Sequence, residues 1–210
     1  MDHLASPADL LEAAESYLLH LHGVLAHLPV AAAAAEAAST AEAADPPVYT
    51  RVSGALAGST IGKHVRHILD HFLIILAVER PDQCASYMKR ERSADTESSV
   101  GGGQAAIMRV VETIRQKKQQ QQHQQQLIQQ QGEELLVAAD ARIFIEDTMP
   151  GNDTAAFVSS WARELWFCTH HMIHHNAIIA CLMHEFGLQP PAEFAYAPST
   201  LKAKHNTDSK

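Results

Sequence analysis

The stretch from Trp161 to Phe186, WARELWFCTHHMIHHNAIIACLMHEF, decides the fold prediction. Its core-facing residues recur at alternating steps of four and three, which is the spacing of a helix face that packs against other helices. The members of this seam are Trp161, Leu165, Cys168, Met172, His175, Ile179, Leu182 and Phe186. Gly187 follows, and Pro190 and Pro191 lie just beyond, so the helix should end near Phe186.

Two histidines of this helix should point toward the protein interior. His175 belongs to the seam, and His171 lies only about 40° from it around the helix, whereas His170 and His174 lie about 100–140° away. Side chains four residues apart are neighbours on a helix surface. His171 and His175 are therefore well placed to bind one metal ion. The alternative is a pair of partly buried, hydrogen-bonded histidines that bind no metal.

A third metal ligand would have to come from another helix, and residues 59–79 form a suitable one. It carries His64, His67 and His71, which lie within about 60° of one another beside an apolar stripe. Periodicity leaves all three open, although the angle places His64 slightly nearer to the stripe. Three imidazoles with an open position match a catalytic zinc site, and nickel and iron also suit imidazole.

Two more helices complete the predicted fold. One covers residues 8–28, where Pro29 should end it, and the other begins near Gln104. Residues 84–103 have the composition of a loop, and residues 135–146 form either a short strand or an irregular connection. Four amphipathic helices without convincing parallel-strand alternation predict an all-α fold, an antiparallel four-helix bundle.

Two low-complexity segments interrupt this pattern. Residues 29–47 are rich in alanine and are interpreted as an insertion or loop, because they offer almost no bulky side chain to bury. Residues 116–132 are rich in glutamine and are interpreted as a second insertion. A chain of 210 residues is otherwise the size of one domain, so residues 1–210 are predicted to form a single helical domain.

Composition excludes several classes of protein. The net charge is −8, whereas a general nucleic-acid binder usually presents a basic face. The longest apolar run, residues 72–78, is far shorter than a membrane span requires, and the first residues lack the features of a secretory signal. Three cysteines without a Cys-x-x-Cys pair favour a reducing compartment. We therefore expect a cytoplasmic protein that binds neither nucleic acid nor membranes.

The last helix has a second apolar strip opposite the seam, which includes Trp166, Ile173, Ala177 and Ala180. A helix that is apolar on two sides needs two partners. The second partner is either the loop near residue 197 or another copy of the chain, which would give a homodimer.

Four pieces of the sequence carry a family resemblance. They are STIGKHVRHILDHF at residues 59–72, YMKRER at residues 87–92 with Glu97 downstream, REL at residues 163–165 leading into HMIHH at residues 171–175, and FAYAPSTL at residues 194–201. Together they span most of residues 10–201, and they resemble the DinB-like (DinB/YfiT) superfamily. The alanine-rich and glutamine-rich segments have no counterpart in that pattern.

The resemblance implies a bundle whose metal ion lies between one histidine of the second helix and the pair in the last helix. Carried over residue by residue, the metal ligands become His67, His171 and His175, with His64 as the alternative ligand. The Ser-Thr start of the second helix favours His67, against the small angular preference for His64.

The same resemblance implies metal binding more strongly than any one reaction. Its members include thiol-dependent S-transferases and candidate metal-dependent hydrolases. We therefore expect a divalent-metal protein that transfers a low-molecular-weight thiol to small electrophiles. The alternatives are a metal-dependent hydrolase and a non-catalytic dimeric module with structural histidines. Tyr87, Arg90 and Arg92 are candidates for binding an anionic group of the substrate, and an ordinary surface ion-pair cluster is the alternative for the arginines.

Overall fold

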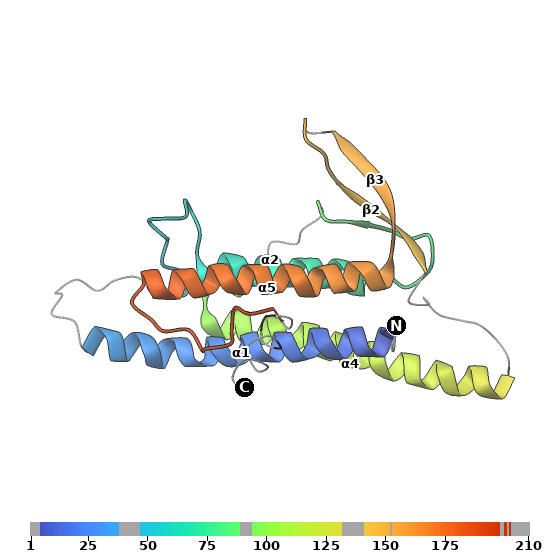
Figure 1. Cartoon of the computed structure of the whole chain (residues 1–210), viewed down its shortest axis with the longest axis horizontal. Coiled ribbons are helices and arrows are strands. Elements are labelled where there is room, and N and C mark those ends of the chain that lie inside the picture. The colour runs from blue at the N-terminus through green and yellow to red at the C-terminus, as the bar shows by residue number, and fades with distance from the viewer. Residues whose placement is uncertain are drawn as a thin grey trace. The chain divides into compact units, whose positions relative to one another are not determined.

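A computed structural model describes residues 5–37, 47–88, 94–131, 141–151 and 153–197, together with residues 200 and 202. Within these ranges, the side chains of residues 29–37, 124, 125 and 127–131 are not described. The elements, labelled in part in Figure 1, are α1 (Pro7–Ala37), α2 (Ile61–Leu76), β1 (Cys84–Ser86), α3 (Ala94–Ser98), α4 (Val100–Gln131), β2 (Arg142–Thr148), β3 (Thr154–Ser160) and α5 (Trp161–Glu185).

The prediction of an all-α antiparallel four-helix bundle is wrong, because three strands form a mixed sheet beside the helices. The strand order is β1-β2-β3, with β1 parallel to β2 and β2 antiparallel to β3. Residues 135–146 include the start of β2, so the short-strand alternative holds there. The strands β1 and β3 were not predicted. Three residues are too few to show periodicity, and β3 contains alanine and serine, which favour strands weakly.

Contacts within the chain divide it into two compact units. Unit 1 comprises Met1–Leu18, Leu69–Arg92 and Met108–Thr169, and unit 2 comprises Leu19–Ile68, Ser93–Ile107 and His170–Lys210. Each unit contains a segment of each long helix (α1, α2, α4 and α5); the sheet belongs to unit 1 and α3 to unit 2. The single domain over residues 1–210, with insertions at 29–47 and 116–132, stays a prediction. Residues 38–46 and residue 132 lie outside the described ranges.

Each long helix begins at a serine or threonine that caps its free backbone amides. Ser6 and Asp9 form a reciprocal capping box at α1, in which the Asp9 carboxylate accepts from both the Ser6 amide and the Ser6 hydroxyl. The hydroxyls of Thr60, Ser99 and Ser160 each accept a bond from the amide three residues later, in α2, α4 and α5 respectively. These caps fix where each helix starts.

The predicted seam of α5 is confirmed as buried, except at its last member. In unit 1 the buried members are Trp161, Leu165 and Cys168, and in unit 2 they are Met172, His175, Ile179 and Leu182. Phe186 is half-buried. The helix ends as predicted at Gly187, which has a φ of +78°. The Leu188 and Gly187 amides donate to the carbonyls of Met183 and His184, which is the Schellman pattern of a helix end.

Three predicted helix boundaries are wrong. The helix α2 ends at Leu76 rather than near residue 79. The helix α1 continues through Pro29 to Ala37. A proline inside a helix costs about 3 kcal/mol, but the residues after it are mostly alanine, which has the highest helix propensity. The helix α4 starts at Val100 rather than near Gln104, because the Ser99 cap lies upstream of three glycines.

Gly62 and Gly103 allow close packing around Tyr49 in unit 2. The Tyr49 hydroxyl donates to the Thr96 carbonyl at 2.7 Å, and Tyr49 is buried. A Cβ atom at Gly62 would meet the Glu97 carbonyl oxygen, and one at Gly103 would meet the Tyr49 hydroxyl. The separation of α2 from α3 and Tyr49 therefore depends on the missing side chain of Gly62.

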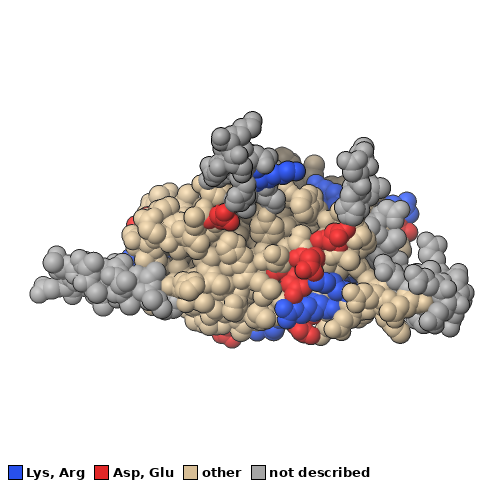
Figure 2. Space-filling view, turned by 60° about the horizontal axis from the view of Figure 1, so that its bottom comes forward, with Lys and Arg blue, Asp and Glu red and all other residues tan. Residues whose placement is uncertain are grey.

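Charged side chains of both signs lie side by side on the surface (Figure 2). In unit 1, Arg115 and Lys118 of α4 form ion pairs with Glu15 of α1, and Lys118 also pairs with Glu12. Burial raises the pKa of Glu15, but the hydrogen bonds and positive charges of Arg115 and Lys118 together outweigh burial, so the pKa is lowered. In the part of the chain that the structure describes, no helix has the length and apolar character needed to span a membrane.

Replacing Gly62 by alanine should destabilise the protein by about 1–3 kcal/mol, because the new methyl group has backbone atoms in its place. The matched control is Gly23→Ala in α1, where a Cβ atom meets nothing within 4 Å. That change should be neutral or stabilising by up to about 1 kcal/mol. Urea unfolding of both variants measures the difference, and equal effects would contradict the packing described here.

Candidate metal centre

Three histidines in unit 2 bring one ring nitrogen each to the same place. His67 lies on α2, while His171 and His175 lie one turn apart on α5. The Nε2 atom of His171 is 2.9 Å from Nε2 of His67 and 3.2 Å from Nε2 of His175. The rings of His67 and His175 have centroids 4.5 Å apart. These three histidines could hold a metal ion.

The spacing of the nitrogens fits the geometry of a shared ion. Two nitrogens that bind one zinc ion at about 2.05 Å lie about 2.9 Å apart for a bond angle of about 90°, and about 3.35 Å apart for a tetrahedral angle. The two Nε2–Nε2 distances of 2.9 and 3.2 Å fall within that interval. His175 is 8% exposed and the other two are half-buried, so the cluster is partly open to solvent.

Hydrogen bonding among the three rings explains this arrangement less well. An imidazole nitrogen carries either one proton or one lone pair. The Nε2 atom of His171 has two nitrogen neighbours at hydrogen-bond distance, and it can form a linear hydrogen bond with only one of them. Three lone pairs directed at one cation satisfy all three nitrogens at once.

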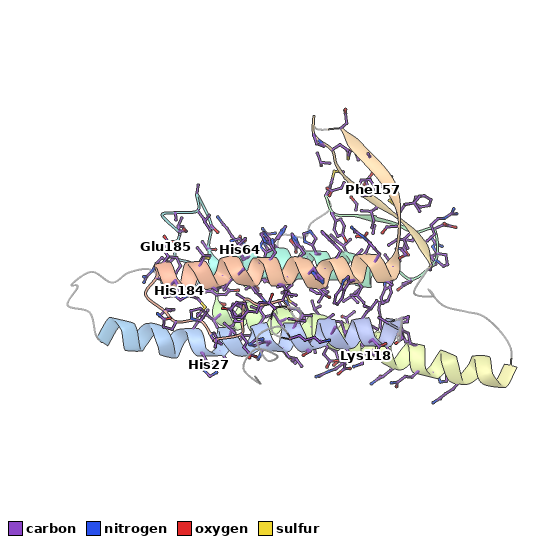
Figure 3. All side chains as sticks on the ribbon, viewed as in Figure 1. His27, His64, Lys118, Phe157, His184 and Glu185 are labelled. Carbon is purple, nitrogen blue, oxygen red and sulfur yellow. The ribbon has the colours of Figure 1, made fainter. Side chains whose placement is uncertain are left out.

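The opposite nitrogen of His175 has a partner of its own. His64 Nδ1 lies 2.8 Å from His175 Nδ1, and His64 Nε2 lies 2.6 Å from the Ser59 hydroxyl (Figure 3 labels His64). If His175 donates Nδ1–H to His64, its Nε2 carries the lone pair that can bind a metal ion. Ligating histidines usually donate their second N–H in this way. His64 is therefore placed to orient His175 rather than to bind the ion itself.

The state of His64 suits this role. Burial, followed by the nearby His174, lowers the pKa of His64. A lowered pKa favours the neutral imidazole, which keeps a lone pair on Nδ1 to accept the His175 proton. The tautomers are inferred from the hydrogen-bond pattern, and the Ser59 hydroxyl can accept from the other nitrogen of His64.

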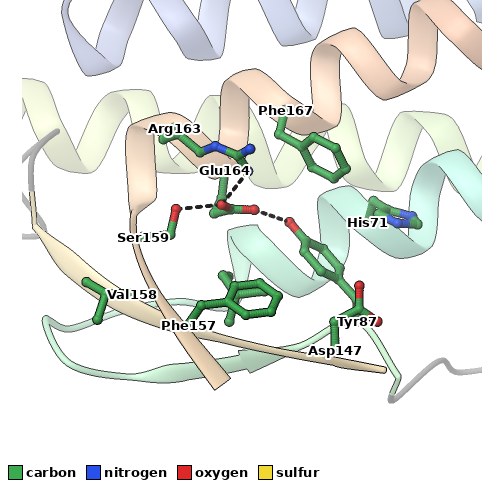
Figure 4. Close-up of a pocket in the computed structure, with 10 residues that line it drawn as sticks. His71, Tyr87, Asp147, Phe157, Val158, Ser159, Arg163, Glu164 and Phe167 are labelled. Atoms are coloured by element: carbon green, nitrogen blue, oxygen red, sulfur yellow. Dashed lines mark hydrogen bonds and ion pairs between the residues drawn. The ribbon is translucent and has the colours of Figure 1, made fainter. Parts of the chain in front are cut away.

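The remaining candidates from the sequence lie elsewhere or outside the described residues. His71, the third possibility on α2, is buried in unit 1, where its ring stacks on Tyr87 with centroids 4.9 Å apart. Tyr87 lines a cavity of about 400 Å³ in unit 1 (Figure 4). Its role in substrate binding stays a prediction. Arg90 and Arg92 lie outside the described residues, so their role also stays a prediction.

Sequence reasoning missed the buried carboxylate of Glu164 in the same cavity. Glu164 is 2% exposed and accepts hydrogen bonds from the hydroxyls of Tyr87 and Ser159 and from the guanidinium of Arg163. Beside them, burial raises the pKa of the Cys168 thiol to about 12, so this thiol is protonated at neutral pH. Glu164 lies three positions after the seam residue Trp161, so it is next to Trp161 on the helix surface. This spacing was the signal in the sequence that the carboxylate could be buried.

Two carboxylates of unit 2, those of Glu97 and Glu185, bind partners outside the histidine cluster. Glu97 pairs with Arg66 at 2.9 Å. Glu185 accepts from the Ser53 hydroxyl at 2.6 Å and from the Gly54 amide at 2.7 Å, and these bonds lower the pKa of Glu185. Among the described residues, the metal-ligand cluster contains histidine only.

Comparisons with known proteins do not identify a family. No protein-family model matches the chain, and no solved structure matches it significantly. FK506-binding protein 5 of Rhizopus delemar is 29% identical over 119 residues, which cover 56% of this chain and 26% of that protein. The chain therefore spans about a quarter of the length of this curated relative, and the reference to FK506 in its name concerns that protein alone.

Replacing His64 by phenylalanine should weaken metal binding by about 10–100-fold, because His175 loses the acceptor that orients it. Competition with a chromogenic chelator measures the affinity, and circular dichroism checks the fold. The control is His27→Ala on α1, an exposed histidine that should leave the affinity unchanged (Figure 3). If His64→Phe abolishes binding to the same extent as removal of His171, His64 is itself a ligand.

Proposed function

We propose that this chain binds one divalent metal ion, of zinc, nickel or iron, through the Nε2 atoms of His67, His171 and His175. The observation that carries the proposal is the position of His171 Nε2, within 3.2 Å of two other imidazole nitrogens. One nitrogen cannot satisfy two such neighbours by linear hydrogen bonds. The resemblance of residues 59–72 and 171–175 to the DinB-like superfamily supports the same assignment.

We further propose that the bound ion serves a thiol S-transferase reaction on small electrophiles. Three protein ligands leave a coordination position for a substrate. When bound, a divalent ion supplies Lewis acidity, which lowers the pKa of a thiol that joins it. In the reaction the thiol loses its proton to solvent, its sulfur forms a bond to the electrophilic carbon, and the leaving group departs with the electron pair of the broken bond.

The residues of unit 2 favour thiol chemistry over hydrolysis. In metalloproteases with a His-Glu-x-x-His motif, a glutamate acts as the general base for the metal-bound water, and the cluster holds no carboxylate among the described residues. The neutral imidazoles of His67, His171 and His175 hold the ion without offsetting its charge. Its full charge then acts on the substrate. We also propose that the second substrate is a low-molecular-weight thiol and that the protein forms a homodimer.

Removing one ligand should remove both the metal and the reaction. Untagged protein, stripped with a chelator and reloaded with zinc, nickel or iron(II), should hold one ion per chain by elemental analysis. It should then consume a chromogenic aryl halide in the presence of a small thiol. His67→Gln and His171→Gln should each lose the ion and the activity while unfolding at nearly the same urea concentration. His184→Ala, an exposed histidine of α5, should retain both (Figure 3).

Metal binding by the three histidines and the S-transferase reaction can be refuted independently of each other. If the glutamine variants retain the metal as well as the His184→Ala control, these histidines are not the ligands. If the metal is bound through them but no thiol is consumed with any of the three ions, the S-transferase assignment is wrong. Hydrolysis of an activated ester by the loaded protein would then favour a hydrolase.

A further inference from the structure

A second candidate binding site lies in unit 1, in the cavity of about 400 Å³ beside β3 and the first turns of α5. A cavity of this volume is within the range of small-molecule sites. Its apolar wall includes Ile145 of β2, Phe157 of β3 and Phe167 of α5, and Tyr87 contributes a further aromatic ring (Figure 4). Phe157 is 44% exposed, so an apolar part of a ligand can reach it.

The central carboxylate of this cavity, Glu164, is already fully paired. It accepts from Tyr87 Oη at 2.8 Å, from Ser159 Oγ at 2.5 Å and from Arg163 Nη1 at 2.7 Å (Figure 4). The Arg163 guanidinium also lies 5.3 Å from the centroid of Phe167. The positive charge of Arg163 is therefore balanced by Glu164, and one face of Phe167 is covered.

A second carboxylate in the cavity wall, that of Asp147 of β2, has no ion pair like the one between Glu164 and Arg163 among the residues that the structure describes. Asp147 is half-buried, and its Oδ1 accepts a bond from the Thr148 amide at 2.8 Å. None of the basic side chains that the structure describes forms an ion pair with it. Arg163 is balanced by Glu164, so the carboxylate of Asp147 adds a negative charge next to the aromatic rings. His71, a further titratable residue of the cavity wall, stacks on Tyr87.

We propose that this cavity binds a small protonated amine, with the ammonium group on Asp147 and the apolar part of the ligand against Phe157 and Ile145, which lie opposite each other on the same face of the sheet. Aromatic faces attract cations, and the attraction grows when water is excluded. Ser159 donates its proton to Glu164, so its oxygen lone pairs remain able to accept an N–H from the ligand. An anion of the same size would face Asp147, and the guanidinium of Arg163 in the cavity wall is already paired with Glu164.

Titration of the full chain with three probes of the same shape tests this proposal. The probes are benzylamine, which is protonated at neutral pH, benzyl alcohol, which is neutral, and benzoate, which is negative. Calorimetry in the presence of a chelator keeps a metal ion from binding the amine. Benzylamine should bind at least about tenfold more tightly than benzyl alcohol, as expected for a hydrogen bond to a charged group, and benzoate should not bind.

Two substitutions locate the site. Asp147→Asn should weaken benzylamine binding by about tenfold and leave benzyl alcohol unaffected, while the amide can still accept from the Thr148 amide. Phe157→Ala should weaken both probes. The matched control is Asp153→Asn in the loop between β2 and β3, an exposed aspartate outside the cavity, which should change neither.

The proposal is overturned if none of the probes binds, if benzyl alcohol or benzoate binds as tightly as benzylamine, or if Asp147→Asn and Asp153→Asn have equal effects. The test does not depend on the proposed metal site, because the His171→Gln variant should give the same benzylamine affinity as the unchanged protein.

Discussion

An imidazole nitrogen has room for a single proton or a single lone pair, and this limit governs the interpretation of unit 2. His171 Nε2 lies close to two nitrogens of the same kind, and a purely hydrogen-bonded arrangement leaves one of these contacts unsatisfied. A shared cation removes the conflict, because all three lone pairs point at it. The chemistry proposed for this chain follows from that constraint, since three ligands both hold an ion and leave a position free.

Local structure in unit 2 holds these rings in place at three levels. The Thr60 cap sets the start of α2, and the Schellman turn at Gly187 sets the end of α5. Gly62 allows α2 to approach the Glu97 carbonyl closely. His64 then fixes the ring of His175 through its second nitrogen and is itself linked to a hydroxyl. The helix caps fix where α2 begins and where α5 ends. Gly62 sets the separation between α2 and α3, and His64 restricts the rotation of the His175 ring.

The sequence was sufficient to predict most of the helical structure and two of the three clustered histidines. Periodicity of four and three placed His171 and His175 on the buried face of α5, because a helix has a fixed angular repeat. It could not choose among three histidines on α2, since all three lie within about 60° of one another on one flank of the helix, and the small preference pointed to His64. The family resemblance selected His67, which is the one that the structure brings into the cluster. The strands β1 and β3 were missed because pairing between distant segments leaves little local signal in short or alanine-containing strands.

X-ray absorption spectroscopy of the zinc-loaded protein tests the central claim most directly, because it reports the atoms around the ion without reference to activity. The convergence of His67, His171 and His175 predicts three nitrogen scatterers at about 2.0–2.1 Å with the outer-shell pattern of imidazole rings, plus one oxygen ligand from solvent. A spectrum with fewer than three imidazoles, or with a sulfur ligand from one of the cysteines, would contradict it.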